Sequence, residues 1–256
     1  MNAESAKQRV RESFERAAVS YDEAAVVQRQ VCERLLAGFT PPAPPTEILD
    51  AGCGTGHGIR LLSERWPAAR ITAVDFAPAM LAFARREPAS CVAADIEALP
   101  FAPASFTTWW SNLTVQWCSA PHAFGEARRV LRGGGCLALS TLGPETFAEL
   151  REAFSGIDRH RHTLSFSEPE VIAAALGDAG FSTIRLHRQT LRLHYPDLKA
   201  LLRAVKDIGA HTVGDNARVG LLGRSAWQRV QAAYERHRTP EGLPARYDVI
   251  LAYAQT

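Results

Sequence analysis

Hydrophobic positions follow two alternating patterns along most of the chain. Short apolar runs, typical of buried strands, alternate with segments in which apolar residues recur every three or four positions, as on one face of a helix. Because parallel strands are joined by helical crossovers, this alternation predicts an α/β fold with a doubly wound, mostly parallel sheet of about seven strands. The predicted strands cover 47–52, 70–75, 90–95, 106–112, 136–142, 181–193 and 246–255.

Two helical patterns precede this alternation. Apolar residues recur at helical spacing from Val10 to Tyr21, and a second helix is expected after Asp22, a residue type that favours the N-cap position. The proline-rich segment 39–47 fits neither a helix nor a strand and indicates a linker. The predicted division is a helical lid at 1–39 and a main domain at 40–256, with a helical insertion at about 196–240 before the last strand.

Three further helices are expected toward the C-terminus. Ser167 and Glu170 have the spacing of a capping box, which predicts a helix from Ser167 to about Ala179. Later helical patterns occupy about 197–209 and 224–238 and supply the predicted insertion.

The stretch EILDAGCGTGHG, from Glu47 to Gly58, carries four glycines at every second position after an apolar run that ends in Asp50. Glycine is unfavourable inside strands and helices, so this spacing indicates a turn where a ligand contacts bare backbone. In a doubly wound sheet that turn lies at the carboxyl end of the first strand, where nucleotides bind. The pattern fits neither the G-x-G-x-x-G dinucleotide fingerprint nor a phosphate loop with G-K-[ST].

Two further acids end the next predicted strands. Asp75 follows the glycine-rich turn by about 20 residues, where a carboxylate can accept both hydroxyls of a ribose. Asp95 lies directly after the third strand. One such acid alone could be a helix cap or a solvated loop residue, but acids at three successive strand ends favour a single nucleotide site.

Composition limits the classes of partner. The chain has 29 basic and 27 acidic residues, a net charge of +2, so no global field attracts a nucleic acid. Its five cysteines are scattered singly and indicate reduced thiols rather than metal ligands or disulfides. No stretch reaches the roughly 18–20 apolar residues of a membrane span. We therefore expect no nucleic acid, no membrane and no metal, and a cytoplasmic location.

The glycine-rich stretch resembles the first motif of the Rossmann-like S-adenosylmethionine-dependent methyltransferases. More narrowly, the strings SYDEAAVVQRQ, WSNLTVQWC and VKDIGA resemble the malonyl-acyl carrier protein O-methyltransferases of biotin synthesis, and this similarity extends from about Phe14 to the C-terminus. It implies S-adenosylmethionine as cofactor, S-adenosylhomocysteine as product, and methylation of the free carboxylate of a malonyl thioester on acyl carrier protein. An ionised carboxylate is already a nucleophile, so this reaction needs no general base.

Other functions remain open at this point. A small-acid carboxylate methyltransferase, such as a trans-aconitate methyltransferase, has a similar sequence around the fourth strand. A C-methyltransferase of the quinone type is disfavoured because it needs a base near an aromatic ring. A nucleotide-binding module without catalysis is the alternative from a different class.

The resemblance also implies roles for individual residues. Asp50 is expected near the ammonium of the cofactor, Asp75 at its ribose, and Asp95 with the Ile96 backbone at its adenine. Tyr21 and Trp117 fit core packing equally well, Lys206 fits a solvated helix face, and His57 and His211 receive no role. The implied cofactor-binding residues are Asp50, Gly52, Gly54, Gly56, Asp75, Phe76, Met80, Asp95, Ile96 and Asn112, and the implied acceptor residues are Tyr21, Asn112, Trp117 and Lys206.

An acyl carrier protein is an acidic partner, so it should dock on basic side chains near the part of the chain that departs from the common methyltransferase core. The expected docking residues are Arg185, Arg188 and Arg192 on the penultimate strand and Lys199, Arg203 and Lys206 on the helix that follows it.

Overall fold

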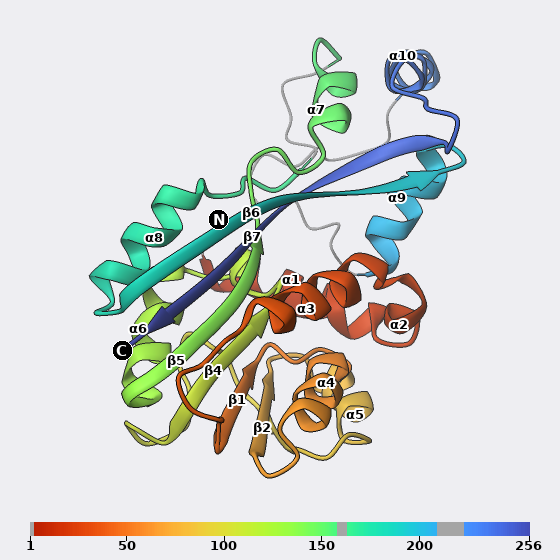
Figure 1. Cartoon of the computed structure of the whole chain (residues 1–256). Helices are drawn as coiled ribbons and strands as arrows, with labels where there is room; N and C mark the ends of the chain where they lie inside the picture. Colours follow the sequence, from red (N-terminus) through yellow and green to blue (C-terminus); the bar gives the residue numbers. More distant parts are fainter. Residues whose placement is uncertain (1–2, 158–162, 209–222) are drawn as a thin grey trace.

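The computed structural model describes residues 3–157, 163–208 and 223–256 (Figure 1). Its centre is a seven-stranded sheet with the order β3-β2-β1-β4-β5-β7-β6. Strands β1 to β5 pair in parallel, and β7 runs antiparallel to both of its neighbours. The prediction of a mostly parallel sheet of about seven strands is confirmed. The strands are β1 (Glu47–Ala51), β2 (Arg70–Asp75), β3 (Ser90–Ala93), β4 (Phe106–Asn112), β5 (Leu131–Leu142), β6 (Ser182–Tyr195) and β7 (Leu243–Gln255).

Helices cover both faces of the sheet because neighbouring strand residues point to opposite sides. Ile48 packs into a core cluster that includes residues of α3 and α4, whereas Leu49 packs into a second cluster with residues of α6 and α8. The helices in the described part of the chain are α1 (Ala3–Ala17), α2 (Tyr21–Ala24), α3 (Val26–Gly38), α4 (His57–Arg65), α5 (Pro78–Ala84), α6 (Ala120–Val130), α7 (Ala148–Phe154), α8 (Pro169–Asp178), α9 (Leu198–Asp207) and α10 (Arg224–Glu235), and the 3-10 helix is η1 (Val115–Trp117). None of these helices is long and apolar enough to cross a membrane.

The N-terminal helices differ from the prediction at two residues. Tyr21 does not continue the apolar stripe of the first helix, because α1 ends at Ala17 and Tyr21 begins α2. Asp22 is not an N-cap but lies within α2, where its Oδ1 accepts a hydrogen bond of 2.5 Å from Thr55 Oγ1. The side chain that was expected to cap a helix instead ties α2 to the glycine-rich turn.

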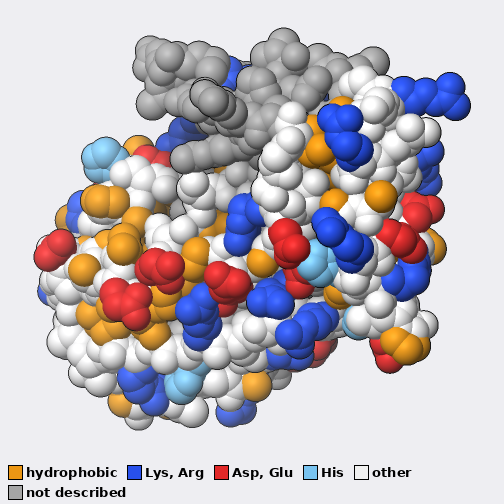
Figure 2. Space-filling view, turned by 90° about the horizontal axis from the view of Figure 1, so that it is seen from above, with side chains coloured by type: hydrophobic (Ala, Val, Ile, Leu, Met, Phe, Trp, Pro, Cys, Tyr) orange, Lys and Arg blue, Asp and Glu red, His pale blue; other side chains and the backbone are white. Residues whose placement is uncertain are grey.

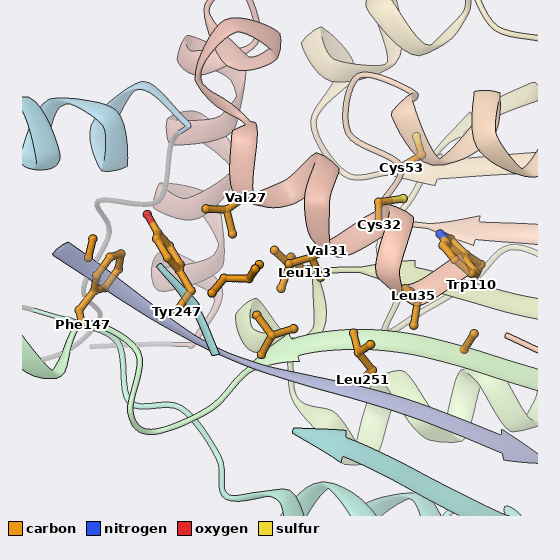
Figure 3. Close-up of a cluster of buried hydrophobic side chains, with 14 of the residues drawn as sticks. Val27, Val31, Cys32, Leu35, Cys53, Trp110, Leu113, Phe147, Tyr247 and Leu251 are labelled. Atoms are coloured by element: carbon orange, nitrogen blue, oxygen red, sulfur yellow. The ribbon is translucent and has the colours of Figure 1, made fainter. Parts of the chain in front are cut away.

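Helix α3 belongs to the core of the main domain. Val27, Val31 and Leu35 are buried in the same cluster as residues of the sheet (Figure 3), and each such side chain contributes roughly 1.5–3 kcal/mol on burial. Tyr253 Oη on β7 also donates to the Leu35 carbonyl at 3.0 Å. A lid over all of 1–39 would have to break this core, so we keep the lid as a proposal for α1 and α2 alone.

The residues at their N-termini explain where helices α8 and α9 begin. The predicted capping box of Ser167 and Glu170 does not form, because Glu168 is the N-cap of α8, with Pro169 at the first position and no side-chain cap bond. Proline already has the φ of a first helical turn and needs no partner for its missing N–H. Helix α9 is capped by Asp197, whose side chain accepts from Ala200 N at 2.8 Å. Helices α9 and α10 lie between β6 and β7, within the predicted insertion.

Candidate active site

The carboxyl ends of the parallel strands form a cleft with two adjoining cavities. The first, the acid cavity, contains Asp75 and Asp95; the second, the loop cavity, contains Asp50 and the glycine-rich turn. Every predicted cofactor-binding residue except Gly56 lines one or both of them. The acid cavity holds Gly52, Gly54, Asp75, Phe76, Met80, Asp95, Ile96 and Asn112, and the loop cavity holds Asp50 together with Gly52, Gly54 and Asn112.

Asp75 is fixed by the backbone around it. Its Oδ2 accepts from Gly54 N and its Oδ1 accepts from Ala77 N, both at 2.9 Å. Burial raises the pKa of Asp75 to about 6. A carboxylate has about four lone-pair sites, so these two bonds leave capacity for the hydroxyls of a ribose. The same side chain thus holds the turn in place and is available to a ligand.

Asp50 is the buried acid of the loop cavity. Its Oδ2 has no hydrogen-bond partner among the described residues, and burial, followed by the charge of Asp75, raises its pKa to about 7. A side chain at Gly58 would come within 2.8 Å of this oxygen, so the glycine provides the space that Asp50 occupies. An unpaired carboxylate oxygen at a cavity wall is complementary to a cation such as a ligand ammonium.

The glycines of the turn serve different neighbours. Gly54 has a φ of +55°, and the nearest atom to an added side chain there would be a ring carbon of Tyr21 at 3.9 Å, so this position is open to the cavity. At Gly56 a Cβ would lie 3.1 Å from Ala84 Cα, and Gly56 lines neither cavity. A role of Gly56 in cofactor binding therefore stays a prediction, while its lack of a side chain lets α5 approach the turn.

Asp95 is paired with a residue that the sequence did not single out. Lys7 Nζ on α1 forms ion pairs with Asp95 Oδ2 and, at 2.9 Å, with Glu97 Oε1, and Lys7 lines the acid cavity. Phe14, from the same helix, packs against Phe76 at 6.3 Å between ring centroids. Helix α1 therefore forms one wall of the acid cavity.

A third cavity, the apolar chamber, lies beside the acid cavity. Its wall combines side chains from the N-terminal helices, the end of β4, α7, α9 and β7, among them Val27, Leu113, Phe147, Val205 and Tyr247. Figure 3 shows Val27, Leu113, Phe147 and Tyr247 within one group of apolar side chains. None of the described residues that line the chamber carries a charge, and its polar groups are amides, a hydroxyl, phenols and the indole N–H of Trp117.

Tyr21 and Trp117 join these cavities. Tyr21 lines the acid cavity, the loop cavity and the apolar chamber, and Trp117 lines the first and the last. Burial raises the pKa of the Tyr21 phenol further above its ordinary value of 10.0, so it is a neutral donor at neutral pH. Trp117 packs edge-on against Phe14 at 5.4 Å between ring centroids. Both residues thus lie where the acid cavity and the apolar chamber meet.

Two other predicted acceptor residues have different positions. Asn112 is occupied within the fold, since its Nδ2 donates to the Gln28 carbonyl at 3.0 Å and its Oδ1 accepts from Ser140 Oγ at 2.8 Å. Lys206 is exposed on α9 and lines none of the three cavities. His211 falls outside the described residues, while His57 lines the loop cavity.

Several residues that line these cavities were not singled out in the sequence. Arg29 lines the loop cavity, and Thr114 lines the acid cavity and donates from Oγ1 to the Gly52 carbonyl at 3.2 Å. Among the described residues no group of three or more His, Cys, Asp and Glu side chains could hold a metal.

Known proteins match both the sequence and the fold. A family described as "Methyltransferase domain" matches residues 49–139. A malonyl-[acyl-carrier protein] O-methyltransferase from Dechloromonas aromatica is 49% identical over 97% of this chain and 94% of its own length. The protein of the same name from Laribacter hongkongensis is 44% identical over 97% of this chain and 89% of its own length.

Two further matches extend the comparison. The biotin biosynthesis bifunctional protein BioHC of Cellvibrio japonicus is 38% identical over 95% of this chain, which corresponds to 49% of that protein. Among solved structures, a SAM-dependent methyltransferase from Thermotoga maritima has the same fold, with a TM-score of 0.59, 18% identity and coverage of 95% of this chain and 98% of that one.

The sheet, the glycine-rich turn and the three strand-end acids define an S-adenosylmethionine-dependent methyltransferase of the Rossmann-like class. Within that class, the extent and identity of the matches settle the family. The chain belongs to the malonyl-[acyl-carrier protein] O-methyltransferase family.

Proposed function

We propose that this protein transfers the methyl group of S-adenosylmethionine to the free carboxylate of a malonyl thioester carried on acyl carrier protein, as an early step of biotin synthesis. The observation that carries the proposal is the junction between a polar, acidic cofactor cleft and an uncharged acceptor chamber, at which Tyr21 stands. Family membership supplies the acceptor class.

The chemistry of the cleft fits the cofactor. The unpaired Asp50 oxygen suits the ammonium of the methionine moiety, Asp75 suits the ribose hydroxyls, and Asp95 suits the exocyclic amine of adenine. The bound cofactor supplies an electrophilic methyl group on a sulfonium. The protein's own residues then orient the two reactants and exclude water.

The apolar chamber suits a carboxylate nucleophile. A malonyl carboxylate is ionised at neutral pH, and removing water from it increases its reactivity toward a methyl cation donor. Tyr21 remains protonated, because burial raises its pKa, so it is suited to donate a hydrogen bond rather than to act as a base. The reaction therefore depends on alignment and desolvation.

Helix α9 connects the chamber with the surface. Leu202 and Val205 line the chamber, whereas Lys199, Arg203 and Lys206 are exposed on the same helix. These three cations are spaced by four and three residues, which places them on one helix face. A thioester arm that reaches the chamber past this helix would bring its acidic carrier protein against that face.

The docking set needs one correction. Arg188 is not available, because its guanidinium forms a bidentate pair with the buried Asp248 at 2.8 and 2.7 Å. Arg185 lies over the ring of Tyr253, with 5.8 Å between its Cζ and the ring centroid. On the face drawn in Figure 2 basic and acidic side chains are mixed, so docking must rely on a local group of cations. We therefore leave Arg188 out of the docking set and centre the test on Lys199, Arg203 and Lys206, which share one face of α9.

Methyl transfer from labelled S-adenosylmethionine to malonyl-acyl carrier protein, malonyl-coenzyme A and trans-aconitate tests the proposal. We expect malonyl-acyl carrier protein to be the best acceptor. Reversing the charge of Lys199 and Arg203 together should lower its kcat/KM several-fold, most strongly at low salt, with little effect on malonyl-coenzyme A. A clear preference for trans-aconitate would instead establish a small-acid methyltransferase.

A further inference from the structure

Gln28 on α3 is the polar residue of the apolar chamber that the fold leaves unused. Its Oε1 is buried without a hydrogen-bond partner among the described residues. Gln28 lines both the apolar chamber and the loop cavity, so its side chain lies between the acceptor space and the site of the cofactor's methionine moiety. Leaving a buried amide oxygen without a partner is unfavourable, which makes a ligand at this side chain the natural explanation.

The backbone of Gln28 is held firmly. Its carbonyl accepts from Asn112 Nδ2 at 3.0 Å, and Asn112 Oδ1 in turn accepts from Ser140 Oγ at 2.8 Å. Ser140 Oγ also accepts from Leu113 N at 2.9 Å. This network links α3 to the ends of β4 and β5, so the side chain of Gln28 extends from a fixed point. Such support is what a substrate-contacting group requires.

A second glutamine in the same chamber shows the contrast. Gln116 Nε2 donates to the Leu113 carbonyl at 2.7 Å, and its Oε1 accepts from Thr141 Oγ1 at 3.4 Å. Gln116 is therefore satisfied by the protein itself, although it lines the chamber as Gln28 does. Both residues carry the same carboxamide group, but only that of Gln116 is hydrogen-bonded within the protein.

We propose that the carboxamide of Gln28 recognises the acceptor carboxylate and aligns it at the junction of the two cavities. The inference rests on the proposed function, because it assumes a carboxylate acceptor. The NH2 group of an amide is a donor that matches a carboxylate oxygen, and a rotation of the amide by 180° exchanges that nitrogen with the buried oxygen. A neutral donor orients the carboxylate without forming an ion pair that would weaken its nucleophilicity.

The test compares two carrier-protein thioesters, of which only the malonyl form has a free carboxylate. Malonyl-acyl carrier protein and acetyl-acyl carrier protein are titrated by calorimetry into the protein saturated with S-adenosylhomocysteine. The wild type should prefer the malonyl form. Gln28→Met should weaken malonyl binding about 10-fold or more and leave acetyl binding unchanged, because hydrogen bonds to charged groups are among the stronger ones. Gln28→Glu should weaken malonyl binding further through charge repulsion.

Gln116→Met is the matched control and should preserve the preference for the malonyl form. Affinity for S-adenosylhomocysteine, measured separately, should stay unchanged in Gln28→Met, and thermal unfolding should confirm that the variants fold. Equal weakening of both acceptors, or a loss of cofactor affinity, would overturn the role of Gln28. Absence of a malonyl preference in the wild type would instead overturn the proposed function.

Discussion

The candidate site has two halves that are built in opposite ways: the cofactor half, made of the acid and loop cavities, and the acceptor half, which is the apolar chamber. The cofactor half combines a glycine-rich turn with Asp50, Asp75 and Asp95, and these acids lie at successive strand ends. The acceptor half is apolar, and its described lining comes from elements as distant in the sequence as α1 and β7. A cationic cofactor with many polar groups needs fixed hydrogen-bonding partners, whereas a carboxylate nucleophile reacts best where water is excluded.

This difference predicts that cofactor binding and acceptor turnover can be changed separately by mutation. Changes in the cofactor half should act on cofactor affinity, since its polar groups are the proposed contacts of the cofactor. Changes in the acceptor half should act on acceptor turnover and leave cofactor affinity intact. A variant that affected both halves equally would break the comparison.

The largest effect is expected at Asp75. Asp75→Ala removes the proposed charged acceptor of the ribose and also the bond that holds Gly54 N. Hydrogen bonds to charged groups are worth about 1.5–3 kcal/mol, so calorimetry should record a loss of about 10- to 100-fold in affinity for S-adenosylhomocysteine. Asp75→Asn, which keeps one oxygen, should lose less. A folded Asp75→Ala protein with unchanged affinity would remove Asp75 from the cofactor site.

The acceptor half is tested by filling the chamber. Val205 lines it from α9, so Val205→Trp should lower kcat/KM for malonyl-acyl carrier protein by about tenfold, because overpacking displaces the reactants from alignment. Val171→Trp makes the same chemical change at a position that is 56% exposed on α8 and should be silent. Cofactor affinity should not change in either variant. A Val205→Trp enzyme with full activity would show that acceptors avoid the chamber.

The cofactor half was predictable because its chemistry lies in short, contiguous motifs. Asp50, Asp75 and Asp95 each follow an apolar run, and parallel strands bring their carboxyl ends to one edge. For Gly56, the alternation with Gly52 and Gly54 did not reveal that this glycine faces α5. Its neighbour Ala84 is 28 residues away in the chain.

The acceptor half could not be predicted in the same way. Phe147, Leu202 and Val205 have the same periodicity as core residues, and only the tertiary fold leaves a space between them. Lys206 differs from these residues, because the spacing of charged residues in the sequence already indicated its exposed position. Its spacing from Lys199 and Arg203 places it with the other cations of α9 on one helix face. That pattern favours a solvated face, and Lys206 is exposed there.

The pH dependence distinguishes the protein alone from its cofactor complex. Asp50 and Asp75 have ordinary pKa values of 3.8, which burial raises to about 7 and about 6. Between the ordinary and the raised values the folded protein binds more protons than the unfolded chain. The contribution of these acids to stability therefore falls as the pH rises through this window.

A bound ammonium favours the ionised form of Asp50, so the cofactor should reverse this trend. The shift in Tm caused by S-adenosylhomocysteine should increase from about pH 5.5 to pH 8, with a few-fold gain in affinity per pH unit below the raised pKa values. Asp50→Asn should flatten that increase. A shift in Tm that is constant with pH in the wild type would contradict the placement of Asp50 beside the ammonium.

The smallest effect is expected where α1 covers the acid cavity. Lys7 pairs with Asp95 and Glu97, and its side chain is 31% exposed. An ion pair of this kind contributes about 0.2–1 kcal/mol. Lys7→Ala should therefore weaken S-adenosylhomocysteine binding by only about 1.5- to 5-fold. Helix α3 provides an internal reference, because its apolar face is buried in the core.

Hydrogen exchange should report the same difference between α1 and α3. Without cofactor, α1 should exchange faster than α3, and S-adenosylhomocysteine should slow exchange in α1 alone. Lys7→Ala should speed exchange in α1 and leave α3 unchanged. Arg16→Ala is the control, because Arg16 pairs with Glu12 on its own helix and does not tie α1 to the main domain. If α1 exchanges as slowly as α3 with and without the cofactor, then α1 is a fixed wall of the cleft and the lid proposal fails.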